Sequence, residues 1–332
     1  MRAVVITKHG GPGVLRVQEQ ADPVLGAGQV RIEVAAAGIN FADVMARQGM
    51  YADAPKTPCV VGYEVAGTIL ELADGVEGLR LGERVFAGTK FGGYASQVVT
   101  DAVNVYPLAE DLSFEQGAAI PVNYATAWAG LIAYGNMQPG ERVLIHSAGG
   151  GVGIAATQIA RSRGAEVYGT ASPGKHERIS EFGVEHPLDY TRPGWDRGLP
   201  PFDIIMDAVG GASFRRSYNM LRAGGRLVAY GASSVVSGER KNVVTALGTV
   251  ARMPRFNMIK QMSESKTVIG LNMLSLWKER GSLKPWIEPV AEMLRDGTDM
   301  PVVASAFPFS EAGAAQNVIT ERRNIGKVVL LP

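Results

Sequence analysis

The sequence predicts an α/β protein built from a partly open antiparallel β-barrel domain and a doubly wound, parallel-sheet domain. The chain has 332 residues, which is more than one ordinary core accommodates. Short strand-like runs between glycine-rich turns fill its first third, and strands alternate with helical patterns from Leu112 onward. Within the second of these regions a short apolar run enters a glycine-rich turn that opens an apolar helix.

We expect the barrel domain to comprise residues 1–121 and 266–332. Turn signals such as Gly10 to Gly13 separate its strand-like runs. Ser113 has the side chain and position of a helix cap before Phe114. The expected strands are Arg2–Thr7, Gln29–Ala36, Val65–Leu72, Arg84–Ala87, Tyr94–Val99 and the closing Lys327–Leu331, and one helix is expected at Leu283–Asp296.

Residues 122–265 are expected to form the second domain, a parallel sheet covered by helices on both faces. Apolar runs of strand length alternate there with longer amphipathic segments. The expected strands are Arg142–His146, Glu166–Ala171, Phe202–Asp207 and Arg226–Tyr230, with a further short strand at Thr267–Gly270 beyond the boundary.

The glycine-rich turn, His146–Gly153, has the order of a dinucleotide-binding βαβ unit. Glycines let the backbone approach a pyrophosphate, whose charge lies at the positive end of the following helix. Ala148 takes the first position of the usual G-x-G-x-x-G pattern. The residues expected to line the phosphates are Gly149, Gly150, Gly151 and Val152. A tight connection that binds nothing is the alternative.

The tip of the second strand predicts NADPH as the cofactor. NAD-binding folds place an acid there to hold the ribose hydroxyls, but Ser172 and Lys175 follow this strand, with Arg178 one turn later. A hydroxyl and an ammonium suit a 2′-phosphate. The alternative is that Lys175 and Arg178 only coat a helix surface.

The composition of the chain indicates which kinds of partner and which cellular compartment to expect. The formal net charge of +1 gives no basic face, so we expect no nucleic-acid partner. The single cysteine, Cys59, excludes an intrachain disulfide and agrees with a reducing, cytoplasmic location. No apolar run is long enough to span a bilayer, and we do not expect membrane contact.

Four motifs together resemble the medium-chain dehydrogenase/reductase superfamily, in its zinc-independent quinone reductase branch. They are Gly38–Asp43, Gly62–Gly67, His146–Gly153 and Asn324–Val329, and they spread the resemblance over essentially the whole chain. The resemblance implies a GroES-like barrel domain, a Rossmann domain and a homodimer.

The residues at which this chain differs from the similar zinc-dependent enzymes indicate which kind of substrate it reduces. The similar zinc alcohol dehydrogenases carry two cysteines and a histidine where this chain has Asn40, Tyr63 and Asn123. Amide and phenol groups are poor zinc ligands. Hydride transfer without a metal favours an electron-poor acceptor, so a quinone or an α,β-unsaturated carbonyl compound is the expected small-molecule substrate.

The resemblance also implies roles for individual residues. Tyr51 matches a tyrosine assigned as proton donor in related enoyl reductases, although it equally suits an aromatic wall. Asn40 would reach the nicotinamide ribose with Asp43 nearby, unless both only form an Asx turn. The other expected cofactor contacts are Lys175 and Tyr190 around the 2′-phosphate, and Gly231, Leu271, Asn272, Met273 and Asn324.

The methionine-rich, basic segment Val250–Met262 resembles the vesicle amine transport protein subgroup. A packing surface or dimer contact is the main interpretation, and a substrate lid or weak membrane attachment are alternatives. Two other functions stay open beside quinone reduction. They are reduction of 2-enoyl thioesters, and NADPH binding with little turnover in a vesicle-associated protein.

Overall fold

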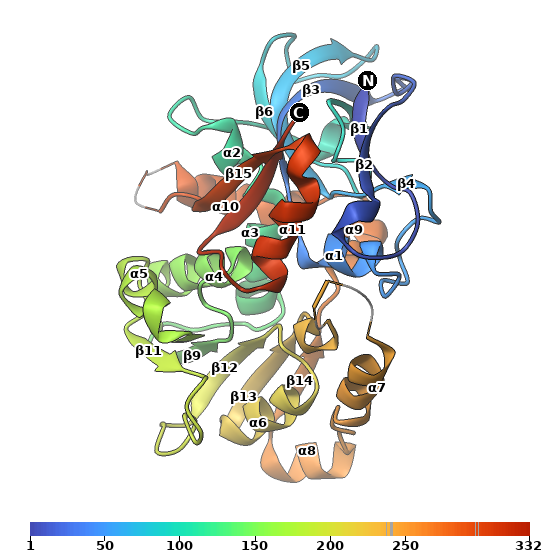
Figure 1. Cartoon of the computed structure of the whole chain (residues 1–332). Helices are drawn as coiled ribbons and strands as arrows, with labels where there is room; N and C mark the ends of the chain where they lie inside the picture. Colours follow the sequence, from blue (N-terminus) through green and yellow to red (C-terminus); the bar gives the residue numbers. More distant parts are fainter. Residues whose placement is uncertain (237, 240–241, 296, 298) are drawn as a thin grey trace. The chain divides into compact units, whose positions relative to one another are not determined.

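The computed structural model describes residues 1–236, 238–239, 242–295, 297 and 299–332 (Figure 1). Backbone contacts divide the chain into two units. The barrel unit comprises Met1–Val122, Leu274–Pro332 and the described residues of Ser237–Lys241. The sheet unit comprises Asn123–Val236 and Asn242–Met273.

The barrel unit contains two sheets. The smaller has the strand order β2-β1-β4, and the larger has the order β15-β16-β3-β5-β6-β8, with β7 also paired to β3. All pairs except β15 with β16 are antiparallel. The strands are β1 (Arg2–Ile6), β2 (Leu15–Glu19), β3 (Gln29–Gly38), β4 (Cys59–Val60), β5 (Glu64–Leu72), β6 (Arg84–Gly88), β7 (Gln97–Asp101), β8 (Val105–Pro107), β15 (Val303–Pro308) and β16 (Lys327–Leu331).

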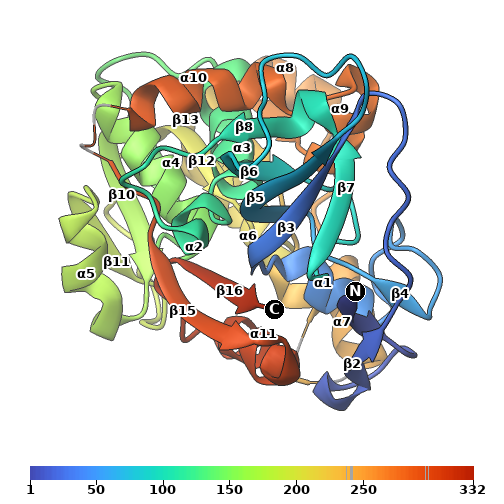
Figure 2. The same cartoon turned by 90° about the horizontal axis from the view of Figure 1, so that it is seen from above.

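Helices complete the barrel unit. The longest, α10 (Lys284–Leu294), buries Trp286, Ile287 and Val290 on one face. Helix α11 (Ala312–Thr320) packs against β16, as both views show (Figures 1 and 2). The short α2 (Phe114–Gly117) begins at Ser113, whose side chain accepts a hydrogen bond from Gln116 N, so the predicted cap is confirmed. The remaining helices are α1 (Phe41–Arg47) and α9 (Met273–Arg280).

The sheet unit is built on six parallel strands in the order β11-β10-β9-β12-β13-β14. The chain starts at β9, runs outward to β11, and returns to place β12 on the other side of β9. This reversal of strand order is the topological switch point, where open α/β sheets bind ligands beyond the carboxyl ends of their strands. The strands are β9 (Arg142–Ile145), β10 (Glu166–Ala171), β11 (His186–Asp189), β12 (Phe202–Asp207), β13 (Leu221–Ala229) and β14 (Thr267–Gly270).

Helices pack on this sheet in the order that the crossovers dictate. Helix α4 (Gly151–Ser162) contacts β9 and β10, and α6 (Ala212–Met220) contacts β12 and β13. Strand β12 is buried along its whole length, as expected for a central parallel strand. The other helices are α3 (Pro121–Trp128), which begins in the barrel unit, α5 (His176–Glu181), α7 (Val243–Ala251) and α8 (Met258–Glu264).

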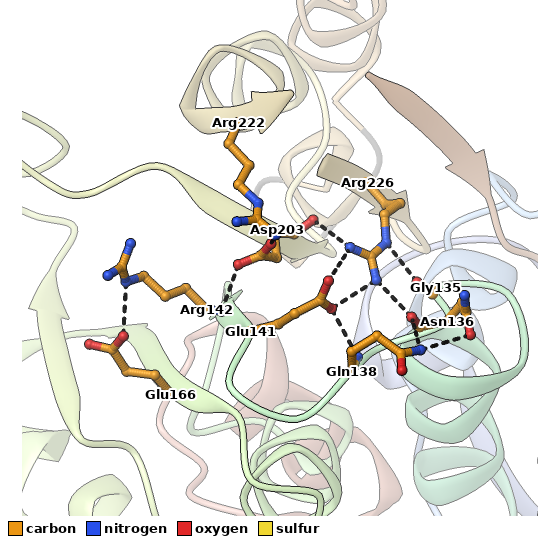
Figure 3. Close-up of polar contacts among 9 residues, drawn as sticks. All are labelled: Gly135, Asn136, Gln138, Glu141, Arg142, Glu166, Asp203, Arg222 and Arg226. Atoms are coloured by element: carbon orange, nitrogen blue, oxygen red, sulfur yellow. Dashed lines mark hydrogen bonds and ion pairs between the residues drawn. The ribbon is translucent and has the colours of Figure 1, made fainter. Parts of the chain in front are cut away.

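Charged side chains pair with one another at the amino edge of this sheet (Figure 3). Arg226 on β13 forms two hydrogen bonds of 2.8 Å to the carboxylate of Glu141, and it also donates to the carbonyls of Gly135 and Asn136. Arg142 pairs with Glu166 at 2.9 Å. Its backbone N–H donates to Asp203, which also pairs with Arg222. These contacts bind the starts of β9, β10 and β12 together.

The predicted strands Glu166–Ala171, Phe202–Asp207, Thr267–Gly270 and Lys327–Leu331 are confirmed residue for residue. The prediction at Tyr94–Val99 began too early, because Tyr94 N bonds to Val61 O and the strand starts at Gln97. Arg226–Tyr230 was too short, since β13 begins at Leu221. The predicted helix Leu283–Asp296 corresponds to α10, and Asp296 lies outside the described residues.

The predicted domain boundary at 265/266 differs from the boundary between the units. Thr267–Gly270 pairs with β13 in the parallel sheet, and the sheet unit extends to Met273. A four-residue apolar run does not specify which sheet it joins, so the sequence did not show this pairing.

Gly67 tests the packing of the barrel. A Cβ atom at that position would overlap the backbone oxygen of Glu33 on the paired strand, so two backbones would have to separate. We expect Gly67→Ala to lower the free energy of unfolding by about 3 kcal/mol or more. The matched control is Gly248→Ala in α7, where nothing lies within 4 Å. That change should instead stabilise the protein by about 0.5–1 kcal/mol. Urea unfolding measures both, and equal effects would contradict the packing argument.

Candidate functional site

The glycine-rich turn leaves β9 and enters α4 through one residue in the left-handed region. Ser147 has φ = 56°, and Gly150 is the cap of the helix that starts at Gly151. A Cβ at Gly153 would lie 2.4 Å from Ser147 O, and one at Gly151 would lie 2.5 Å from Asn123 Nδ2. Glycine at position 153 therefore lets the helix approach the backbone of the turn, and glycine at position 151 leaves room for the Asn123 side chain of α3. The N-terminus of a twelve-residue helix follows, with Val152 in its first turn.

The predicted phosphate-binding residues leave neighbouring strands at the same edge. Ser172 follows β10, and Tyr190 follows β11 directly after Asp189, which pairs with Ala171. A Cβ on Gly149 would lie 3.4 Å from Lys175 Cδ, so this lysine runs beside the glycine turn. Partial burial lowers the pKa of Lys175.

Arg178 has a different environment from Lys175. Its guanidinium forms an ion pair with Glu181 and lies 4.6 Å from the centre of the Phe182 ring. Both contacts are on its own helix or directly after it, so Arg178 coats the helix surface, as the alternative interpretation held.

The remaining predicted residues of the sheet unit leave β13 and β14 at the same edge. Leu271 N donates to Ala229 O at 2.9 Å, which places Leu271, Asn272 and Met273 directly after the carboxyl end of β14. A Cβ at Gly231 would lie 3.0 Å from Ala208 O, in the connection after β12. The structure thus gathers all the predicted sites of this unit along one edge of the sheet.

A buried hydrogen-bond network at this edge was not predicted. The His146 ring lies 3.2 Å from Thr170 Oγ1 through Nδ1 and 3.0 Å from Ser217 Oγ through Nε2. Ser217 and Ser213 donate to Asp207 Oδ2 at 2.7 and 2.8 Å. His146, Thr170, Ser217 and Asp207 are each at most 3% exposed. A histidine between an apolar strand and a glycine turn was the available sequence signal.

In the barrel unit, Asn40 belongs to a buried polar cluster. Its Nδ2 donates to Glu64 Oε1 at 2.9 Å, and Lys327 Nζ donates to its Oδ1 at 2.7 Å. Lys327 also forms an ion pair with Glu64, and Val122 N donates to the other carboxylate oxygen at 2.7 Å. Glu64 is fully buried, and Lys327 is 3% exposed. The amide of Asn40 is therefore fixed in orientation by a charged pair.

Asp43 lies in the barrel core. Its carboxylate accepts hydrogen bonds from Asn40 N (2.7 Å), Tyr94 Oη (2.9 Å) and Gly62 N (3.1 Å). Complete burial outweighs these three donors and raises the pKa of Asp43 to about 7. The hydrogen bond from Asn40 N to Asp43 joins the cap of α1 to the third residue of its first turn, as in a capping box.

Tyr51 and Asn324 lie elsewhere in the barrel unit. The Tyr51 ring meets the Tyr63 ring edge to face, with centroids 6.5 Å apart, and packs against the barrel core. Burial, assisted by the charge of Asp53, raises the pKa of Tyr51. Asn324 donates from Nδ2 to Gly326 O at 2.9 Å, in the connection before β16.

The methionine-rich segment Val250–Met262 contributes the last two residues of α7, the connection that follows and most of α8. Met258, Ile259 and Met262 are 73–77% exposed. This exposure agrees with each of the predicted roles and favours none of them.

Two features are absent from the described residues. No three His, Cys, Asp or Glu side chains in that part of the chain lie together as ligands for a metal ion. No helix there is both long enough and apolar enough to cross a bilayer.

Asp43 should make stability depend on pH. Its pKa is about 7 in the folded protein against an ordinary value of 3.8, so the folded state holds a proton that the unfolded state has lost between these values. The free energy of unfolding should therefore fall as pH rises from about 4 to about 7, by up to about 4 kcal/mol, and level off above. Urea unfolding of Asp43→Asn, subtracted from wild type at each pH, isolates this dependence. A difference that stays constant from pH 4 to pH 7 would contradict it.

Two family models match the chain. The model described as alcohol dehydrogenase GroES-like domain matches residues 26–110, and the one described as zinc-binding dehydrogenase matches residues 182–330. Among curated proteins, the synaptic vesicle membrane protein VAT-1 homolog of Danio rerio is 35% identical, over 99% of this chain and 69% of the relative. Its Homo sapiens counterpart is 33% identical, over 100% of this chain and 86% of the relative.

Solved structures agree with these relatives. Human synaptic vesicle membrane protein VAT-1 homolog-like protein superposes with a TM-score of 0.86 at 32% identity, over 100% of this chain and 98% of that one. A mycobacterial protein complexed with NADPH gives 0.85 at 27% identity, over 100% of both chains. The quinone oxidoreductase of Pseudomonas syringae gives 0.83 at 27% identity, over 100% and 99%.

The relatives match the whole chain. One family model lies within the barrel unit, and the other spans the second half of the sheet unit and the C-terminal part of the barrel unit. Both the predicted resemblance and the predicted fold class are confirmed. The chain belongs to the medium-chain dehydrogenase/reductase family, in its quinone oxidoreductase branch, together with the VAT-1 homologues.

Proposed function

We propose that this protein is an NADPH-dependent reductase that transfers hydride, without zinc, to quinones or related α,β-unsaturated carbonyl compounds. One observation carries the proposal. A glycine turn, a helix N-terminus and a partly buried lysine lie together at the switch point of a parallel sheet. The neighbour solved with NADPH and the neighbour that is a quinone oxidoreductase support it.

The residues present fit a dinucleotide. The glycine turn and the first turn of α4 would offer the pyrophosphate the backbone N–H groups of Gly149, Gly151 and Val152. The Gly150 N–H already donates to Ser147 O at 2.8 Å, so Gly150 would contribute only close approach of its backbone. Lys175, with Ser172 and Tyr190 nearby, would hold the 2′-phosphate. The acid that ends the neighbouring strand, Asp189, is paired with Arg192 at 3.0 Å and accepts a hydrogen bond from Thr191. Its charge is therefore balanced, and it does not oppose a phosphate.

The barrel unit supplies a fixed amide and a phenol. The Lys327–Glu64 pair holds Asn40 in one orientation, which suits contact with a ribose hydroxyl. At the three positions where zinc-dependent relatives hold the metal, Asn40, Tyr63 and Asn123 offer no thiolate or imidazole. Bound NADPH would supply the hydride, and the protein's part is to orient the acceptor and exclude water.

The acceptor would be electron-poor, because no Lewis acid would polarise its oxygen. A quinone or enone would spread the incoming charge over its own conjugated system. Hydride addition would give a hydroquinone monoanion or an enolate, and uptake of one proton would complete the hydroquinone or the saturated carbonyl compound. The raised pKa of Tyr51 makes this phenol a weak acid that can still donate a hydrogen bond to that oxygen.

Asp43 and Asn324 remain proposed cofactor neighbours, and a cytoplasmic homodimer remains the expected state.

Activity with purified protein tests the proposal. We expect tight binding of NADPH, seen as a change in nicotinamide fluorescence. We also expect 1,2-naphthoquinone to oxidise NADPH, seen as loss of the nicotinamide absorbance at about 340 nm. Faster oxidation with crotonyl-CoA would favour the 2-enoyl-thioester reductase alternative. Binding of NADPH without consumption by either acceptor would favour the low-turnover protein that the VAT-1 relatives suggest.

Lys175 should set the preference for NADPH. Loss of one charge-assisted contact to the 2′-phosphate should weaken NADPH binding about 10- to 100-fold in Lys175→Ala and leave NADH binding nearly unchanged. Arg178→Ala is the matched control, because Arg178 is engaged by Glu181 and Phe182. Fluorescence titration with both nucleotides measures the ratio. Equal losses for NADPH and NADH, or an equal loss in the control, would remove the proposed phosphate site.

A further inference from the structure

The buried network at the carboxyl edge draws one side chain from each of three adjacent strands. Thr170 lies near the end of β10, His146 directly follows β9, and Asp207 ends β12. Ser217 of α6 lies between the histidine and the aspartate. The chain of contacts therefore crosses the switch point beneath the glycine turn.

Asp207 fixes the direction of the hydrogen bonds. Its Oδ1 accepts from the backbone N–H groups of Val209 (2.8 Å) and Gly210 (3.3 Å), and its Oδ2 accepts from the hydroxyls of Ser213 and Ser217. All four partners donate. The hydroxyl hydrogen of Ser217 therefore points to Asp207, and Ser217 Oγ can only accept a hydrogen bond from the His146 ring.

This commitment specifies the tautomer of His146. Nε2 must carry the hydrogen that Ser217 accepts, so Nδ1 has a lone pair and accepts from the Thr170 hydroxyl. Burial lowers the pKa of His146, which agrees with a neutral ring. For this neutral ring, only one arrangement of protons satisfies every member of the network.

The last member of the network is the glycine turn itself. Thr170 Oγ1 accepts from Ser147 N at 3.2 Å, and Thr170 O accepts from Ala148 N at 3.0 Å. Ser147 has φ = 56°, a conformation that a residue with a side chain adopts only when its surroundings hold it. One threonine therefore holds two successive N–H groups of the strained turn, and its own hydroxyl hydrogen is directed by His146.

We infer that Thr170, His146 and Ser217 are positioning residues. They form a chain of hydrogen bonds from the Asp207 carboxylate to the cofactor turn, and this chain holds Ser147 in its left-handed conformation. The inference rests on the proposed function for its effect on NADPH binding. None of the three side chains is proposed to touch the cofactor. Each acts through the next, and the turn presents its N–H groups to the pyrophosphate as a result.

Isosteric variants of Thr170 test the inference. Thr170→Val keeps the shape and removes the hydroxyl, and we expect the Kd values of NADPH and NADH to rise by the same factor, about three- to tenfold. The KM of the acceptor and kcat at saturating NADPH should not change. Thr170→Ser restores the hydroxyl and should recover most of the affinity. Unchanged nucleotide affinity in a folded Thr170→Val protein, or equal losses in the two variants, would overturn the inference.

A second measurement needs no cofactor. Nitrogen-15 NMR of wild-type protein with labelled histidine should show His146 as the neutral Nε2–H tautomer. Ser217→Ala removes the acceptor of that hydrogen and should shift the ring resonances, whereas Ser213→Ala, which removes the other hydroxyl bound to Asp207, should shift them much less. A Nδ1–H tautomer in wild type would overturn the inference. Failure of the wild type to bind NADPH, with the expected tautomer present, would instead contradict the proposed function.

Discussion

Parallel pairing of β9 with β10 on one side and β12 on the other is the constraint on which the sheet unit depends. The registers Val143–Val167 and Val143–Ile204 bring the three strands level, so that they begin together and end together. Every functional placement in this unit follows from that alignment. The glycine turn, the residues after β10 and the connection after β12 meet because their strands stop at one edge.

The two edges of the sheet differ in the polar groups they hold. At the amino edge, paired charges such as Arg226 with Glu141 satisfy one another, and little remains for a ligand. At the carboxyl edge, the buried network consists of hydroxyls and an imidazole arranged around one carboxylate, Asp207. This arrangement holds backbone N–H groups in place without adding a positive charge of its own. The helix N-terminus and Lys175 then determine which anion is accepted.

Patterns within a short stretch of sequence predicted much of this structure. Continuous apolar runs located β10, β12 and β14 to the residue, and the glycine spacing located the turn into α4. Contacts between distant residues were beyond such reasoning. The His146–Ser217 contact joins residues 71 apart, and the Lys327–Asn40 contact joins residues 287 apart. Local patterns contain no information on these pairs. The burial of Asp43 was missed for the same reason, since Tyr94 and Gly62 reach it from other elements.

The ion pair between Lys327 and Glu64 has a consequence for synthesis on the ribosome. The two residues are 263 positions apart, and Glu64 is fully buried in the finished barrel. While the chain is being translated, β5 therefore emerges long before its counter-ion, and closing the barrel around Glu64 alone would bury an uncompensated charge. The parallel sheet ends at Gly270, so it can assemble first. We therefore expect the barrel to close fully around Glu64 only when β16 brings the Lys327 ammonium, which adds the opposite charge to the hydrogen bonds from Asn40 and Val122.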